Sequence, residues 1–191
     1  MDFGTSYGLA FASGVNAYLP LLSFAIAARW FHPYKVNPDF QFITQDWFII
    51  VLVILAIADL VADKIPGVDH VWDAIHTVIR PIAGAIVAAA SANVSGAGLP
   101  VTLVLGGTLA GMTHTTKAAT RIACTTTTAG LLNTVISIVE DIIVVITILL
   151  SLFAPYVMLI VIAIFVLLFL IFMRRIFRAL SRRRQKAQAG V

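Results

Sequence analysis

The chain has 191 residues, of which 60% are hydrophobic and only 12% are charged. An ordinary soluble domain is about 25% charged, and so small a polar complement cannot cover a globule of this size in water. Composition therefore excludes soluble globular, disordered and fibrous proteins and predicts an integral membrane protein.

The formal net charge of +4 arises from a cluster of seven basic residues at the C-terminus. The rest of the chain has six bases and all 9 acids. That cluster consists of Arg174, Arg175, Arg178, Arg182, Arg183, Arg184 and Lys186. It directly follows an apolar run, which predicts an anchor at anionic lipid headgroups and no nucleic acid partner. We therefore expect a single transmembrane helical domain over residues 1–173 and a basic cytoplasmic tail over 174–191.

Six apolar segments follow one another, each about as long as the twenty-odd residues that cross a bilayer as a helix. They cover residues 7–28, 47–64, 71–92, 100–121, 129–153 and 156–173, approximately. The predicted fold class is all-α, a polytopic membrane bundle of about six transmembrane helices. Trp47 and Trp72 are expected to be anchors at the membrane interface. Gly106, Gly107, Ala110 and Gly111 form the clearest surface for close helix packing.

An even number of spans places both termini on one side, and the basic tail makes that side cytoplasmic. The turns near Lys64 and Arg121 then fall inside, and the uncharged turns at Ser95 and Pro155 fall outside. Each half of the chain opens with a helix of small and polar residues, and an apolar helix with acids follows. This pattern allows a 3+3 inverted repeat, which is a transporter architecture. Gly14 and Asn16, just before Pro20, mark a place where the first helix can break.

Ionisable and polar residues recur at helical spacing inside the apolar segments. Asp59 and Asp63 share one helix face. Three further stripes occur: Asp69, Asp73, His76 and Arg80 on the third segment; His114, Lys117 and Arg121 on the fourth; Asn133, Ser137 and Glu140, with Asp141 beside it, on the fifth. A charge near the bilayer centre costs about 2.5–3.5 kcal/mol, so these groups must pair, face inward or line water. We expect a buried cluster in the cytoplasmic half of the membrane.

The candidate residues for an ion or substrate site are the polar residues of these helix faces, together with Asn16, Lys64 and Asp141. The full set is Asn16, Asp59, Asp63, Lys64, Asp69, Asp73, His76, Arg80, His114, Lys117, Arg121, Asn133, Ser137, Glu140 and Asp141. Glu140 carries the most weight, because it lies about twelve residues into an apolar span. Purely structural interpretations stay open for some of these residues. Asp69 can cap a helix, Lys64 and Asp63 can lie solvated at the lipid headgroups, and His76 can be a hydrogen-bonded core histidine.

Three functions stay open at this point. The leading hypothesis is a small transporter or channel-like protein whose charged site takes an ion, a proton or a small anionic solute. The second is an enzyme on lipid phosphates that binds Mg²⁺ through Asp59/Asp63 and Asp69/Asp73, with Arg80 and Arg121 on the phosphate. The third is a structural scaffold with a buried ion-pair network. The pattern favours a protein that is not an enzyme, without deciding the question.

Cofactor evidence in the sequence is slight. No haem, flavin, nucleotide or zinc motif occurs, and the single cysteine, Cys124, excludes an intramolecular disulfide or a cysteine metal site. A divalent cation remains open, and its ligands would come from Asp59, Asp63, Asp73, His76 and Glu140.

Two motifs resemble those of a known bacterial membrane family. One is Ala62 to Asp69 (Ala-Asp-Lys-Ile-Pro-Gly-Val-Asp) followed by Trp72-Asp73, His76 and Ile79-Arg80-Pro81; the other is Gly14 to Pro20. His114, Lys117, Arg121 and the segment Ser137 to Asp141 are also similar. The chain resembles the family known as domain of unknown function 4126 over about residues 5–160. The resemblance implies a multipass protein of the bacterial cytoplasmic (inner) membrane and supplies no activity. Apart from the resemblance, the lipid bilayer is the expected partner, and the small size of the chain leaves a homo-oligomer open.

Overall fold

A computed structural model describes residues 3–31, 33–62, 64–65, 68–92, 96, 98–128 and 133–189. Within these ranges, the side chains at 69–70, 125–128, 133 and 179–189 lie outside the description. The structure is 89% helical, and the described residues include no strand, which confirms the all-α fold class. The helices are α1 (Phe3–Ser13), α2 (Leu19–Trp30), the 3-10 helix η1 (Pro38–Thr44), α3 (Asp46–Ala62), α4 (Val68–Ser91), α5 (Gly98–Thr128), α6 (Asn133–Phe153) and α7 (Pro155–Ala189).

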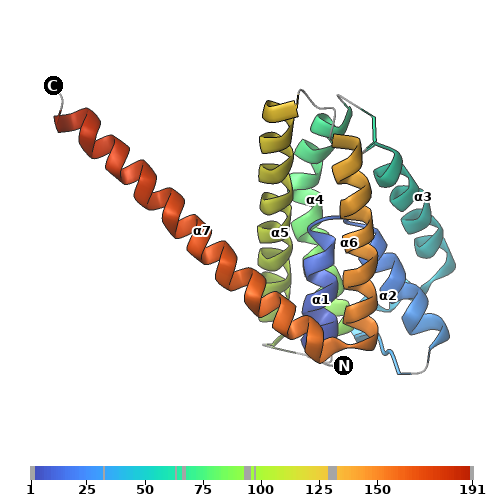
Figure 1. The fold of residues 1–191 in the computed structure, drawn as a ribbon. Coiled ribbons are helices and arrows are strands. Elements are labelled where there is room, and N and C mark those ends of the chain that lie inside the picture. The colour runs from blue at the N-terminus through green and yellow to red at the C-terminus, as the bar shows by residue number, and fades with distance from the viewer. Residues whose placement is uncertain are drawn as a thin grey trace. The chain divides into compact units, whose positions relative to one another are not determined.

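The chain divides into two compact units, residues 1–159 and 160–191. The second unit consists of the rest of α7, and the boundary that the charge pattern predicts at residue 173 stays a prediction. In the first unit, α1 is the central helix: it contacts α4, α5 and α6, and nine of its eleven residues are buried. Figure 1 shows α1 among these helices.

The first predicted span, residues 7–28, is not one helix. The helix ends at Ser13, and a new one begins at Leu19. Asn16 explains the new start: its Oδ1 accepts hydrogen bonds from the backbone N–H groups of Tyr18 (3.0 Å) and Leu19 (2.9 Å), and Pro20 occupies the first turn of α2. Helices of 11 and 12 residues are about 16–18 Å long, which is roughly half of a bilayer core.

The two short helices form a hairpin that enters and leaves at the same end of the first unit (Figure 1). Gly4, at the start of α1, packs directly against the backbone of Pro155. Tyr34, just after α2, donates a 2.7 Å hydrogen bond from its hydroxyl to the carbonyl of Leu152, beside Pro155. We call residues 3–30 the N-terminal hairpin and residues 14–18 its tip. The tip meets α5 near Ala110 and Thr113, close to the middle of that 31-residue helix.

Among the described residues, three helices are long and apolar enough to cross a membrane, within Val71–Ser91, Thr134–Phe153 and Pro155–Arg178. A fourth crossing is made if η1 and α3, bent by 66°, count as one span. The expected span over 100–121 is not among them, because Thr, Gly and His lower the hydropathy of α5. Six spans are therefore not confirmed. The continuous α5 also differs from the broken α1–α2, so the expected inverted repeat finds no support in these two elements.

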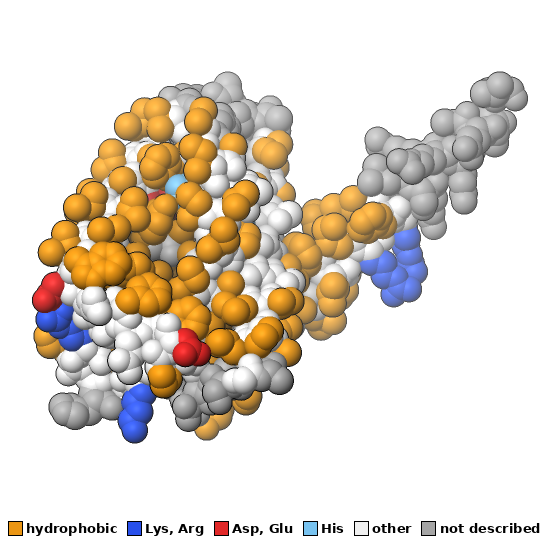
Figure 2. Space-filling view, turned by 180° about the vertical axis from the view of Figure 1, so that it is seen from behind, with side chains coloured by type: hydrophobic (Ala, Val, Ile, Leu, Met, Phe, Trp, Pro, Cys, Tyr) orange, Lys and Arg blue, Asp and Glu red, His pale blue; other side chains and the backbone are white. Residues whose placement is uncertain are grey.

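Burial in the first unit is the reverse of that in a soluble protein. Arg80 and Asp59 are fully buried, whereas Ile54, Val104 and Ile142 are more than half exposed. Hydrophobic side chains cover most of the described face in Figure 2, and few charged side chains reach it. This distribution is compatible with a membrane protein, in which hydrocarbon surrounds the bundle.

Close packing between α4 and α5 depends on glycine. A Cβ on Gly106 would lie 2.7 Å from the carbonyl oxygen of Gly84, and a Cβ on Gly84 would collide with that of Ala110. Gly107 and Gly111 have more space, because a Cβ added to each would lie 3.1 and 3.8 Å from the nearest atom of Pro81. The surface expected from Gly106, Ala110 and their neighbours is thus the contact that brings the charged stripes of α4 and α5 together.

Candidate functional site

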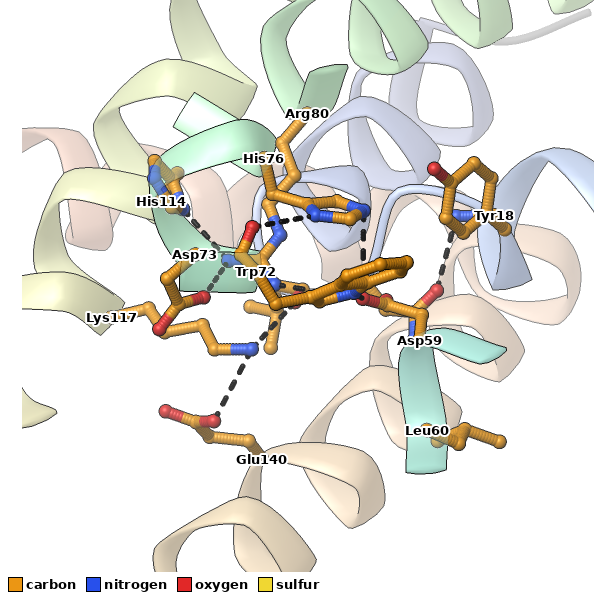
Figure 3. A network of polar contacts seen from close by, with 12 residues as sticks. Tyr18, Asp59, Leu60, Trp72, Asp73, His76, Arg80, His114, Lys117 and Glu140 are labelled. Carbon is orange, nitrogen blue, oxygen red and sulfur yellow. Dashed lines mark hydrogen bonds and ion pairs between the residues drawn. The ribbon is translucent and has the colours of Figure 1, made fainter. Parts of the chain in front are cut away.

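Most of the predicted polar residues converge just beyond the tip of the N-terminal hairpin (Figure 3). α3 contributes Asp59, α4 contributes Asp73, His76 and Arg80, α5 contributes His114, Lys117 and Arg121, and α6 contributes Glu140. We call these eight residues the charge network. On α4, the spacing of three and four residues puts its members on one face, as the sequence predicts.

The acids and bases of the network alternate in a chain that runs from α3 to the hairpin tip. Arg80 comes first: its Nη2 is 3.9 Å from Asp59 Oδ1, and its Nη1 is 2.9 Å from Asp73 Oδ1. The other oxygen of Asp73 lies 3.2 Å from Arg121 Nη1. Asp73 therefore links the two guanidinium groups, one from its own helix and one from α5.

The second half of the chain connects α5 with α6 and the tip. Arg121 donates to Glu140 Oε2 from Nη2 (2.7 Å) and Nε (3.2 Å). Lys117 Nζ lies 3.4 Å from the same oxygen and donates a 3.0 Å hydrogen bond to the backbone carbonyl of Val15 in the tip. A cation at this carbonyl also complements the partial negative charge at the C-terminal end of α1.

The network is balanced in charge: Asp59, Asp73 and Glu140 face Arg80, Lys117 and Arg121. The exposed fractions of these six side chains range from 0% to 14%. An unpaired member would cost several kcal/mol at such burial, whereas the alternating arrangement gives each charge an opposite neighbour. With neutral histidines, the network carries no net charge.

His114 is held in one tautomer by its neighbours. Its Nδ1 lies 2.8 Å from Arg80 Nη1, which can only donate, so Nδ1 must accept. Its Nε2 lies 3.1 Å from the Thr77 hydroxyl, and that hydroxyl gives its one proton to the Asp73 carbonyl at 3.0 Å. Nε2 therefore carries the hydrogen, and His114 is neutral in this arrangement.

Asp59 and His76 form the end of the network that faces Trp72. The indole Nε1–H of Trp72 donates a 2.7 Å hydrogen bond to Asp59 Oδ1. His76 Nδ1 is 2.8 Å from the Trp72 carbonyl, and its Nε2 is 3.6 Å from Asp59 Oδ1. The Tyr18 and His76 rings meet nearly at right angles, with 5.6 Å between their centroids, which connects this pair to the hairpin tip.

Some predicted site residues lie elsewhere. Lys64 and Asp141 form their own 2.6 Å ion pair and are 37% and 26% exposed, so they stand apart from the buried network. Ser137 is fully buried one turn before Glu140, and its Oγ has no hydrogen-bond partner among the described residues. Asp63 and the side chains of Asp69 and Asn133 lie outside the described residues, so the predictions for them stay predictions.

Sequence reasoning missed three contributors. Trp72 was expected only as an anchor at the membrane interface, which stays a prediction, and its indole also donates to Asp59; its position four residues before His76 was the available signal. Thr77 follows His76 and fixes the tautomer of His114. The backbone carbonyl of Val15 could not be recognised from the sequence, because only the break in the helix leaves it available to Lys117.

The proposed metal ligands are not assembled into a metal site in the described part of the chain. No group of three or more His, Cys, Asp and Glu side chains there is arranged to hold a metal ion. Asp59, Asp73 and Glu140 each face a base instead. A divalent cation that also uses Asp63 stays a prediction.

One family model matches the chain, described as "Domain of unknown function (DUF4126)", over residues 3–175. The match confirms the resemblance seen in the two sequence motifs and extends it to the first apolar part of α7. No curated protein and no solved structure matches.

Proposed function

The chain belongs to the DUF4126 family, and we propose that it is a small multipass transport protein whose site is the charge network at the hairpin tip. The substrate class is an ion, a proton or a small anionic solute. The observation that carries the proposal is the meeting of two half-length helices with buried ionisable groups midway along the bundle. Broken helices that end at charged residues are how transporters expose backbone polar groups to a substrate at the membrane midplane.

The hairpin suits this role because it leaves polar backbone where a continuous helix would hide it. α1 ends and α2 begins at the tip, and the carbonyl of Val15 accepts a hydrogen bond from Lys117. A change in the partners of Lys117 would release this carbonyl to another cation or to water. The tip and the network therefore form one site in which a substrate can replace an internal contact.

The hairpin supports a proposed topology that differs from the expected one. If α3 to α7 each cross the bilayer, the N-terminus lies on the side of Pro155, and the basic tail lies on the side of the turn with Lys64. The positive-inside rule then makes the Lys64 side cytoplasmic, in the inner membrane of a bacterium. The termini lie on opposite sides in this arrangement, because the hairpin returns to its own side without crossing.

A structural role is the second candidate, and the balanced pairing favours it. A network in which every acid faces a base can hold helix order without moving. A scaffold of this kind would work through a partner copy or another membrane protein. The enzyme hypothesis has weaker support, because Asp59 and Asp73, one from each predicted Mg²⁺ pair, are separately engaged by Trp72 and by the arginines.

Flux measurements on proteoliposomes with the full chain test the transport proposal. The probes are proton movement driven by a potassium diffusion potential, and uptake of labelled sodium, chloride and phosphate. We expect wild type to exceed empty liposomes for at least one probe and Glu140→Gln to lose most of this excess. Asp46→Asn is the matched control, because Asp46 pairs with Arg29 in an exposed ion pair outside the network. Background flux with every probe, from protein shown to be folded, would contradict transport.

A further inference from the structure

We propose that Asp59 and His76 form a proton-binding site that holds one shared, exchangeable proton, and that this proton is the coupling ion of the transport protein. The second half of this statement rests on the function proposed above. The first half rests on the contacts of two buried side chains, and it can be tested without any knowledge of the transported solute.

The first step concerns the hydrogen on His76. The ring nitrogen Nδ1 lies 2.8 Å from the Trp72 carbonyl, which can only accept a hydrogen bond. Nδ1 therefore donates and carries a hydrogen. If His76 is neutral, its other nitrogen, Nε2, has a lone pair and no hydrogen.

The second step concerns what Nε2 faces. Asp59 Oδ1 is 3.6 Å away, which is an ion-pair distance, and both side chains are at most 1% exposed. A lone pair and an ionised carboxylate would repel each other here, with little solvent to separate them. A proton on Nε2, or on the carboxyl group, turns this repulsion into attraction. The pair is therefore built to hold one proton between them.

The third step concerns the groups around the pair. Tyr18 faces it from the hairpin tip and lies within the fields of Asp59 and Arg80. Arg80 faces it from α4 and also pairs with Asp73, His114 lies near His76 from α5, and Glu140 of α6 joins through Arg121 and Asp73. Because the other two acids and three bases of the network sum to +1, the network has a net charge of +1 with the shared proton and zero without it.

Loss of the proton strengthens the attraction of Asp59 for Arg80, which otherwise pairs with Asp73. Arg80 Nη1 is at 2.9 Å from Asp73, while its Nη2 is 3.9 Å from Asp59. With the proton in place, His76 and Trp72 satisfy Asp59, and Arg80 stays with Asp73. When the proton leaves to water, Asp59 is an anion without its protonated neighbour and attracts Arg80 more strongly. Arg80 also holds His114, so its movement changes contacts along α5 that lead to Lys117 and the tip.

Nuclear magnetic resonance of the four histidines, in full-length protein labelled with ¹⁵N in the imidazole rings and placed in lipid nanodiscs, tests the shared proton. His76→Gln assigns the His76 signals. Infrared spectra of the same samples report whether a buried carboxyl group is protonated, and Asp59→Asn assigns that band. We expect either a doubly protonated His76 or a hydrogen on Nδ1 together with a protonated Asp59 at pH 7. Both probes should titrate at one midpoint.

The variants separate this pair from other acids. In Asp59→Asn, His76 should become neutral at pH 7, whereas Asp46→Asn should leave its signals unchanged. If Asp59→Asn does not fold, Asp59→Glu keeps the acid, and the common midpoint of the two probes in wild type remains the test. A neutral His76 beside an ionised Asp59 at pH 7, or two separate midpoints, would overturn the proposal.

Flux measurements separate this inference from the proposed function. If the pair titrates as expected and no probe is transported, the proton site stands and transport fails. If a solute is transported but its flux neither responds to a pH gradient nor changes in His76→Gln, transport stands and the proton is not the coupling ion. Flux that depends on the gradient in wild type and loses this dependence in His76→Gln supports both.

Discussion

Removal of the Arg80 guanidinium is the sharpest test of the charge network. Arg80 is fully buried and contacts Asp59, Asp73 and His114. Arg80→Met keeps most of the side-chain volume but leaves three buried acids with two bases. Removal of one partner from a buried pair costs about 3–5 kcal/mol, because the other charge stays buried without compensation. On the scale of soluble proteins, this loss corresponds to a decrease in Tm of roughly 6–20 °C.

Thermal and chemical unfolding in detergent micelles, followed by circular dichroism, measures this loss. Arg29→Met is the control, because the Arg29–Asp46 pair is exposed and should contribute less than about 1 kcal/mol. The double variant Arg80→Met/Asp73→Asn restores equal numbers of acids and bases. It should recover about 1–3 kcal/mol of the single-variant loss. Equal small losses for Arg80→Met and Arg29→Met would refute the reasoning, as would a double variant less stable than Arg80→Met.

The double variant also separates the two candidate functions. In the transport protein, Arg80 and Asp73 are parts of the site, so a folded double variant should lose flux. In a scaffold, a folded double variant should keep the assembly that the wild type forms, as measured by its size in native micelles. The same purified sample serves both measurements, which removes differences in folding from the comparison.

Two further predictions concern the helices that position the network. Gly84→Ala should lower the free energy of unfolding by about 1–3 kcal/mol, because the new Cβ would collide with that of Ala110. Gly111→Ala should be neutral or slightly stabilising, because its new Cβ would lie 3.8 Å from Pro81. Thermal unfolding of both variants measures the difference. Asn16→Ala should cost about 0.5–2 kcal/mol, because the backbone N–H groups of Tyr18 and Leu19 lose the acceptor that Asn16 Oδ1 provides at the start of α2. Hydrogen exchange at these two amides should quicken in that variant, and unchanged protection would contradict this role of Asn16.

The sequence determined the class of the protein and most members of the network. A chain with 60% hydrophobic residues buries charges only where they pair, so Asp73, Arg80, Arg121 and Glu140 had to meet other ionisable groups. Helical spacing also fixed which residues of α4 and α5 share a face. Neither argument depends on how the helices are arranged, and both the all-α fold and the convergence of these stripes agree with the structure.

The tertiary structure alone decided which groups pair and where the chain reverses. Arg80 and Asp73 pair within α4, whereas only the close approach of α4 and α5 at Gly84 and Gly106 brings His114 to Arg80 and Arg121 to Asp73. Residues 7–28 read as one apolar span, because hydropathy averages over a break of five residues. The two hydrogen bonds that Asn16 accepts and the hydrogen bond from Lys117 to Val15 stabilise the reversal, and the bond from Lys117 joins residues 102 positions apart.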